Sequence, residues 1–202
     1  MTNNAFLAIW SDVSAETEVD YLHWLTREHT TERLSVDGFR SVRVYRALNM
    51  GICRYLILYD LASPSVLDSE SYLRRLNAPT PWSHRIMPIL GNFIRGGGQV
   101  SNAFGTGHGG VLGAVRFAAH PYPDAKALQS IAGRDLVVAA RLLETDTGRT
   151  TVQSKEKGMR DRDTTFAALL LVEGLKEQAV REALTHAGLG AQAELFRQVF
   201  QL

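Results

Sequence analysis

A histidine and an arginine lie one turn apart in residues 14–36, which we expect to form a helix. On a wheel of about 3.6 residues per turn, His29 falls between Leu22 and Leu25, in the middle of the apolar stripe, and Arg33 lies on the same side. An imidazole that faces a sheet can act as a general acid or base, or can anchor a substrate in a cavity. The alternative is a core histidine whose ring is hydrogen-bonded to a strand hydroxyl or carbonyl group.

Arg33 adds a charged group to this face of the helix. Its guanidinium can orient the carboxylate or phenolate of a substrate; the alternative is a surface arginine whose stem packs on the helix while its head reaches water. On the wheel, His23, Glu28 and His29 do not share a face, so we expect no metal site here. Trp24 also falls away from the stripe and is expected to cover a neighbouring element or a subunit contact.

The strand-like segment 39–48 alternates between two kinds of side chain. Val42 and Val44 point to one face, and Arg43 and Tyr45 point to the other. In a barrel, the valines suit the face under the helices, which leaves Arg43 and Tyr45 for the lumen. There Tyr45 can donate a hydrogen bond to a developing oxyanion, and Arg43 can bind substrate. The alternative is a pair of polar residues that hold each other between packed sheets.

Trp82 and His84 lie in the proline-rich stretch 78–88, which we expect to be a loop. An aromatic residue and a histidine on a loop can close over a pocket and bind substrate. The alternative for Trp82 is packing over one end of the barrel. Ser83 directly precedes His84, and adjacent residues do not form a nucleophile–base pair by spacing alone. The sequence has no GxSxG segment, so it does not support hydrolase triad chemistry.

Two glycine-rich segments lack the residues that nucleotide binding requires. GGG at residues 96–98 has no following Lys-Ser or Lys-Thr, and we expect a bulge or bend in a strand. GTGHGG at residues 105–110 opens no helix and is expected to be a flexible joint. The segment 145–163 is polar and is expected to be a mobile hairpin, with the charged run 155–163 as its solvated tip.

Strand and helix signals follow the same order, βαββαβ, in both halves of the chain, which is the order of a ferredoxin-like unit. The expected strands cover residues 5–11, 39–48, 54–61, 92–104, 111–119, 136–144, 165–172 and 195–201, with a turn at 49–51. The expected helices cover residues 14–36, a stretch that begins at Ser63-Pro64, 123–133 and 175–187. We therefore predict an α+β fold with two tandem ferredoxin-like units, residues 1–105 and 106–202.

Composition limits the partners of the protein. The 22 basic and 21 acidic residues give a net charge of +1, so no charge excess favours binding to nucleic acid or to a membrane surface. No apolar run is long enough to cross a membrane, and the first residues lack the basic segment of a signal peptide, so we expect a cytoplasmic protein. The single cysteine, Cys53, excludes an internal disulfide. All 3 tryptophans lie in residues 1–105, which favours that unit as the one with the site.

The first helix and the strand after it also carry a family resemblance. YLHWLTREH at residues 21–29, ERL at 32–34 and DGF at 37–39, before an alternating strand, resemble the dimeric α+β barrel superfamily and most closely its EthD-like branch. The resemblance implies that two ferredoxin-like sheets pair into a barrel, either within a duplicated chain or between subunits, which leaves a homodimer open. Members of the superfamily include cofactor-free monooxygenases, cyclases, decarboxylases and haem proteins, so the resemblance constrains the fold more than the reaction.

Together these observations lead to one functional hypothesis and two alternatives. We expect a small-molecule enzyme that acts on an aromatic or polyketide-like compound without a metal or cofactor, by oxygenation, cyclisation or decarboxylation. His29 is the expected acid or base and Tyr45 the second catalytic group, while Arg33, Arg43, Trp82 and His84 bind substrate. Haem bound through His29 remains open. The alternatives are a non-catalytic ligand-binding or stress-associated module and an oligomerisation module, so the residues alone do not decide whether the protein is an enzyme.

Overall fold

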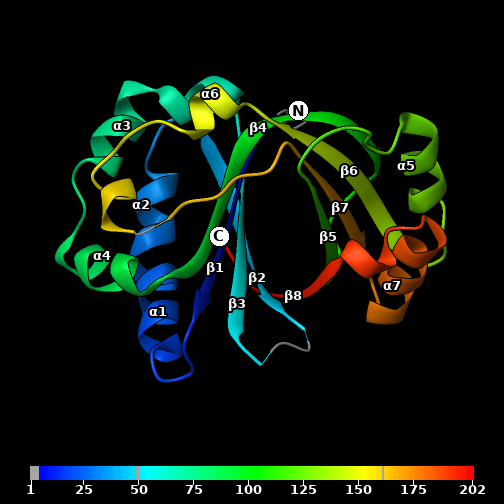
Figure 1. The fold of residues 1–202 in the computed structure, drawn as a ribbon, viewed down its shortest axis with the longest axis horizontal. Helices are drawn as coiled ribbons and strands as arrows, with labels where there is room; N and C mark the ends of the chain where they lie inside the picture. The colour runs from blue at the N-terminus through cyan, green and yellow to red at the C-terminus, as the bar shows by residue number, and fades with distance from the viewer. Residues whose placement is uncertain (1–4, 49–50, 161) are drawn as a thin grey trace.

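The computed structural model describes residues 5–48, 51–160 and 162–202, so most of the turn expected at residues 49–51 lies outside the described residues. Eight antiparallel strands in the described ranges close into a barrel, with helices on two opposite sides (Figure 1). This architecture confirms the predicted α+β fold. The strands are β1 (Ala5–Val13), β2 (Phe39–Ala47), β3 (Cys53–Leu61), β4 (Gly91–Gly105), β5 (Val111–Phe117), β6 (Val137–Thr145), β7 (Ala168–Gly174) and β8 (Glu194–Gln201).

The barrel combines two sheets of the same internal order. Around the closed barrel the strands follow the order β1-β3-β2-β8-β5-β7-β6-β4. The first half therefore contributes the sheet β4-β1-β3-β2, and the second half contributes β8-β5-β7-β6, which has the same internal order. The second strand of each half pairs with the fourth strand of the other, at β2–β8 and at β4–β6. Each half therefore buries the inner face of its sheet against the other half.

The helices cover the outer faces of the two sheets. In the first half they are α1 (Glu18–Trp24), α2 (Thr30–Leu34), α3 (Glu70–Leu76) and α4 (Pro81–Ile86). In the second half they are α5 (Ala125–Ala132), α6 (Thr147–Thr150) and α7 (Glu177–His186). Figure 1 shows α5 and α7 on one side of the barrel, whereas α6 lies on the opposite side, with the helices of the first half. The connection between β6 and β7 therefore crosses the edge of the barrel.

Alternation along the strands divides the apolar residues between the barrel lumen and the helices. On β1, Leu7 and Ile9 pack under the helices, while Phe6 and Trp10 point into the lumen. This follows from the two-residue period of a strand. Apolar side chains from both halves fill the middle of the lumen. The barrel is thus a packed core, and open space lies at its mouth and on the outer face of the first half.

The glycines at 96–98 allow close packing rather than forming a bulge. Strands β1 and β4 pair in regular register through Gly96, Gly97 and Gly98, so the expected bulge is wrong. A Cβ atom on Gly96 would lie 2.3 Å from the Phe166 ring, and one on Gly98 would lie 2.1 Å from the carbonyl oxygen of Glu144. Side chains at these positions would force the neighbouring groups apart, so the strand needs glycine there.

A buried carboxylate ties the two halves together at one mouth of the barrel. Glu173 of β7 is fully buried and accepts hydrogen bonds from Arg43 at 3.2 Å, from Arg141, and from the backbone N–H of Gly109 at 3.1 Å. His108 lies 3.1 Å from the same carboxylate. Burial alone raises the pKa of Glu173, but the hydrogen bond with His108 and the charges of Arg43 and Arg141 outweigh it, and the pKa is lowered.

Replacing Glu173 with alanine is expected to destabilise the fold by about 3–5 kcal/mol, because Arg43 and Arg141 would lose a buried counter-charge. The free energy of unfolding in urea measures this loss. Glu70→Ala is the matched control, since Glu70 forms only an exposed pair with Arg74, and it should leave the free energy of unfolding nearly unchanged. A Glu173→Ala variant as stable as this control would contradict the proposed role of the cluster.

Candidate functional site

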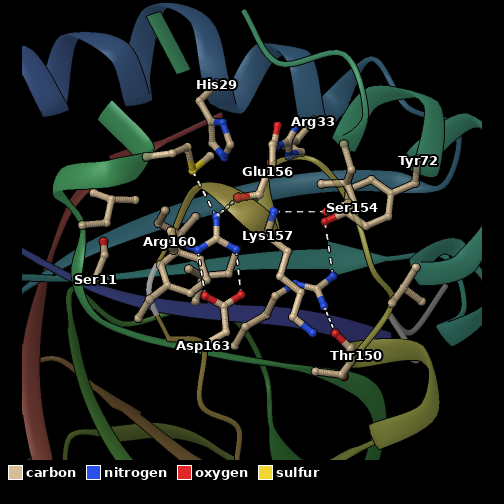
Figure 2. Close-up of a pocket in the computed structure, with 18 of the residues that line it drawn as sticks. Ser11, His29, Arg33, Tyr72, Thr150, Ser154, Glu156, Lys157, Arg160 and Asp163 are labelled. Atoms are coloured by element: carbon tan, nitrogen blue, oxygen red, sulfur yellow. Dashed lines mark hydrogen bonds and ion pairs between the residues drawn. The ribbon is translucent and has the colours of Figure 1, made fainter. Parts of the chain in front are cut away.

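A pocket lies between the first helical segment and the outer face of the first half's sheet (Figure 2). Ile9 of β1 and Ile57 of β3 line it from the sheet side, and His29 and Arg33 enter from the helices. The segment between α6 and β7 lies across the pocket and contributes Glu156 among other residues. The pocket is partly open, and the space inside it that water-sized groups can occupy is about 50 Å³. Because one water molecule needs ~10–15 Å³ of such space, the pocket takes a few water molecules as it stands.

A π-helical turn positions the residues at the top of the pocket. The expected helix begins at Glu18 rather than after Ser14, and residues Leu25–His29 form a π-turn between α1 and α2. In a π-turn the N–H group bonds five residues back, so residues five apart share a face. Trp24 and His29 therefore pack together, with ring centroids 4.2 Å apart.

The expectation that Trp24 falls away from the apolar stripe is wrong, because that wheel assumed an uninterrupted α-helix, but the expectation that Trp24 covers a neighbouring element is confirmed at α4. Trp24 is buried, and its indole N–H donates to the Ser83 hydroxyl at 3.2 Å. The hydrogen bond ties the first helix to α4. Trp24 thereby forms a wall that holds the His29 ring in the pocket.

His29 faces the sheet as the apolar stripe predicted, and it is 3% exposed. Its Nδ1 atom has no hydrogen-bond partner among the described residues, unlike the ring of a satisfied core histidine. Burial lowers the pKa of His29 well below 6.5, and the charges of Arg33, Arg160 and Arg75 lower it further. The ring is therefore neutral near pH 7 and has a free position for a proton or a hydrogen bond.

Arg33 forms a buried ion pair with Glu156, at 2.5 Å between Nη2 and Oε2. The two side chains are 3% and 5% exposed, so Arg33 is not the surface arginine of the alternative interpretation. Burial alone lowers the pKa of Arg33, but the charge of Glu156 outweighs it, and the pKa is raised. Arg33 Nη1 and Glu156 Oε1 have no partner among the described residues. The pair thus keeps one free donor and one free acceptor.

The covering segment is fixed to the first half at several points. The N–H of Glu156 donates to the carbonyl of Leu76 at 3.2 Å. Arg160 forms two hydrogen bonds with Asp163, at 2.8 and 2.7 Å, and its guanidinium lies 3.8 Å from the centre of the Phe93 ring. The expectation of a solvated tip at residues 155–163 is therefore wrong for Glu156 and Arg160, which line the pocket with their charges paired, whereas Lys155 and Arg162 are exposed as expected. The polar composition of the segment does not separate these two kinds of residue.

Positive charge exceeds negative charge around the pocket. The basic side chains that line it are those of Arg33, Arg95, Lys157 and Arg160, and the acidic ones are those of Glu156 and Asp163. Tyr72 also lines the pocket, with the Arg33 guanidinium 5.9 Å from its ring centre. This balance in a partly dry site favours a ligand that carries or develops negative charge. Glu156, Lys157 and Arg160 were missed by the sequence interpretation, because nothing in a polar run indicates which surface it will cover.

Arg43 and Tyr45 lie on the opposite face of the sheet from His29. Tyr45 belongs to the packed lumen, and its hydroxyl accepts a hydrogen bond from Arg43 at 3.2 Å. Burial raises the pKa of Tyr45. Arg43 lines a separate pocket of about 490 Å³ at the barrel mouth, next to Asp60, His108 and Glu173. The structure therefore does not bring Tyr45 and Arg43 together with His29 and Arg33.

Trp82 and His84 do not line the pocket of His29 either. The proline-rich stretch forms the short helix α4, with Thr80 as N-cap and Pro81 at its first position, so the expected loop is wrong. Trp82 is half-buried, and its indole N–H donates to Asp20 at 3.0 Å, while His84 is exposed. Within this stretch Met87 lines the pocket, and Ser83 holds the pocket wall through its hydrogen bond with Trp24.

In the pocket as it stands, haem does not fit beside His29. A haem protein needs an iron ligand that faces a cavity large enough for the macrocycle. The His29 ring lies against Trp24, and the adjoining space of about 50 Å³ takes only a few water molecules. No step of the chemistry below runs through haem.

The part of the chain that the structure describes holds neither a cluster of metal-ligating side chains nor a membrane-spanning helix. No group of three or more His, Cys, Asp or Glu side chains in the described ranges has an arrangement that could hold a metal ion. None of the helices built from those residues has the length and apolar character needed to span a membrane.

Solved structures with the same fold are found, although no family model matches the chain and no curated protein is similar to it in sequence. An anthrone oxidase-like protein superposes with a TM-score of 0.65 at 13% identity, covering 100% of this chain and 93% of that one. A "Putative monooxygenase" from Fusobacterium nucleatum gives 0.53 at 10% identity, covering 100% and 95%. A "Putative Chlorite dismutase" gives 0.54 at 11% identity, covering 99% and 96%. The likeness confirms the α+β barrel fold predicted from the first helix, and at these identities it shows the fold alone.

The neutral buried ring of His29 predicts a change in the pH dependence of stability. Below pH 6.5 this histidine is protonated in the unfolded chain but not in the folded chain. The unfolded state therefore binds more protons, and the free energy of unfolding decreases as the pH is lowered. His29→Gln should remove this part of the loss, which approaches ~1.4 kcal/mol per pH unit below 6.5.

Urea unfolding of both proteins at pH 7.5, 6.5 and 5.5 measures the difference. The chain has 6 histidines, and all but His29 are unchanged in the variant. The wild type should therefore lose more stability than the variant between pH 6.5 and 5.5. Parallel curves for the two proteins would show that His29 titrates in the fold as it does in the unfolded chain.

Proposed function

We propose that the protein is a cofactor-independent enzyme that oxygenates an aromatic or polyketide-like compound in the pocket of His29. The observation that carries this proposal is the free Nδ1 atom of a neutral, buried histidine in a pocket with excess positive charge. Such a site takes a proton from a weakly acidic C–H or O–H group and stabilises the anion that remains. The names of the anthrone oxidase-like and monooxygenase structures support the reaction type by analogy.

His29 acts as the base in this mechanism. Its lowered pKa keeps the ring unprotonated near neutral pH, so Nδ1 can accept the substrate proton. Arg33 then offers its unpartnered Nη1 to an enolate or phenolate oxygen, and the excess positive charge of the pocket lowers the cost of forming this anion. The anion reacts with O2: an activated CH2 group becomes a carbonyl group, and the second oxygen atom leaves as water. Cyclisation or decarboxylation would use the same anion stabilisation without O2.

The substrate enters when the covering segment moves outward. The accessible space of about 50 Å³ is below the ~150 Å³ of an apolar cavity that binds benzene, so an aromatic ring needs more room. The hydrogen bonds from Arg33 to the Glu156 carboxylate and from Arg160 to the Met87 sulfur hold the segment closed. Its closure after binding would exclude water from the anion.

The remaining candidate residues act outside this pocket in the proposal. Tyr45 and Arg43 brace the lumen and the barrel mouth, while Trp82 and His84 belong to α4, which Trp82 joins to α1 through Asp20. A non-catalytic ligand-binding module is the second candidate, since the barrel-mouth pocket of about 490 Å³ has the volume of a small-molecule site. It predicts ligand binding without turnover and without dependence on His29.

His29→Gln should lower kcat for O2 uptake with a hydroxyanthrone at least ~100-fold, the smaller end of what a positioned base contributes. An oxygen electrode measures uptake, and quinone formation should match it one to one. His186→Gln is the control, because His186 is an exposed histidine on α7, on the other side of the barrel. Unchanged kcat and KM in His29→Gln would remove His29 from the mechanism, and no uptake by the wild type would favour the binding module.

A further inference from the structure

Buried polar atoms without partners gather around the pocket of His29. Among the described residues, the buried side-chain atoms that lack a hydrogen-bond partner include His29 Nδ1, Arg33 Nη1 and Glu156 Oε1, and all three residues line this pocket. Each such atom costs about 1–3 kcal/mol if nothing satisfies it. A folded protein rarely leaves several of them together, so water molecules or a ligand complete them.

The three atoms differ in what they require. Arg33 Nη1 is a donor, and it needs an oxygen that accepts. Glu156 is held by Arg33 through its other oxygen, at 2.5 Å, so Oε1 is a carboxylate oxygen that needs a donated O–H or N–H group. His29 Nδ1 accepts a proton from the substrate in the mechanism above. A ligand that satisfies all of them therefore presents an acceptor oxygen and, close to it, a hydroxyl group.

Resting on the proposed function, we propose that the substrate class is hydroxylated: an oxyanion or carbonyl oxygen binds Arg33 Nη1, and a hydroxyl on the same molecule donates to Glu156 Oε1. Glu156 is then the residue that selects hydroxylated compounds. It is contributed by the second half of the chain, so the first half alone does not form the complete site. Recognition of this kind is selective, because a ligand without the hydroxyl leaves a buried carboxylate oxygen unsatisfied.

Substituted benzoates test this selectivity without turnover. Each supplies a carboxylate for Arg33, and 3-hydroxybenzoate differs from 3-methylbenzoate in a hydroxyl that replaces a methyl group of similar size. Titration calorimetry at pH 7.5 should give a Kd for 3-hydroxybenzoate at least ~10-fold lower than that for 3-methylbenzoate, from one hydrogen bond to a charged acceptor.

Glu156→Gln should reduce this preference to about threefold or less, because a neutral amide oxygen is a weaker acceptor and is no longer fixed by an ion pair. Asp163→Asn is the matched control. Asp163 also lines the pocket, but both of its oxygens already accept from Arg160, so the ~10-fold preference should persist. Unfolding curves of both variants show whether they fold.

Equal Kd values for the two benzoates in the wild type would overturn the proposal, and so would the absence of binding by both. A preference that Glu156→Gln leaves intact would overturn the role of Glu156. None of these results depends on oxygen uptake. If O2 uptake requires His29 but the protein binds the two benzoates equally, the proposed function stands and the hydroxyl selectivity fails. If the protein prefers 3-hydroxybenzoate but shows no O2 uptake that depends on His29, the hydroxyl selectivity stands and the proposed function fails.

Discussion

The buried ion pair between Arg33 and Glu156 is the contact on which the candidate site depends. It joins a helix of the first half to the segment between β6 and β7 of the second half. Removing one partner of such a pair typically costs about 3–5 kcal/mol, because the other charge stays buried. The pair therefore closes the pocket strongly only while both charges remain, and Arg33 Nη1 stays available to a ligand while Nη2 holds Glu156.

The closed barrel divides the polar residues between two faces of one sheet. Val42 and Val44 of β2 pack under the helices, whereas Arg43 and Tyr45 point into the lumen and its mouth. Glu173 compensates the charge of Arg43 at the mouth and thereby holds the two halves in register. Because a strand presents alternate residues to opposite faces, the groups near His29 and those near Tyr45 act on separate spaces. Chemistry at one of them needs no contribution from the other.

The His29 ring is neutral mainly because of the groups packed around it, and less because of its position in the helix. Burial is the largest cause of its lowered pKa, and arginines from the helix, from α3 and from the covering segment add to it. The same arginines favour an anion beside the ring. Burial and these charges also disfavour an imidazolium, so the proposed proton transfer needs the anion to form beside the ring and offset its charge, with water excluded while the anion reacts.

The sequence by itself determined the element order, the α+β class and the faces of His29, Arg43 and Tyr45, because these follow from periods of 3.6 and 2 residues that local sequence carries. It did not determine the π-turn that places Trp24 beside His29, or the helix at α4. Only the tertiary structure decided that residues 155–163 cover the pocket and that Glu156 meets Arg33, which lies 123 positions away in the chain. Local periodicity holds no information about such a pairing, since it arises only when the second half closes the barrel.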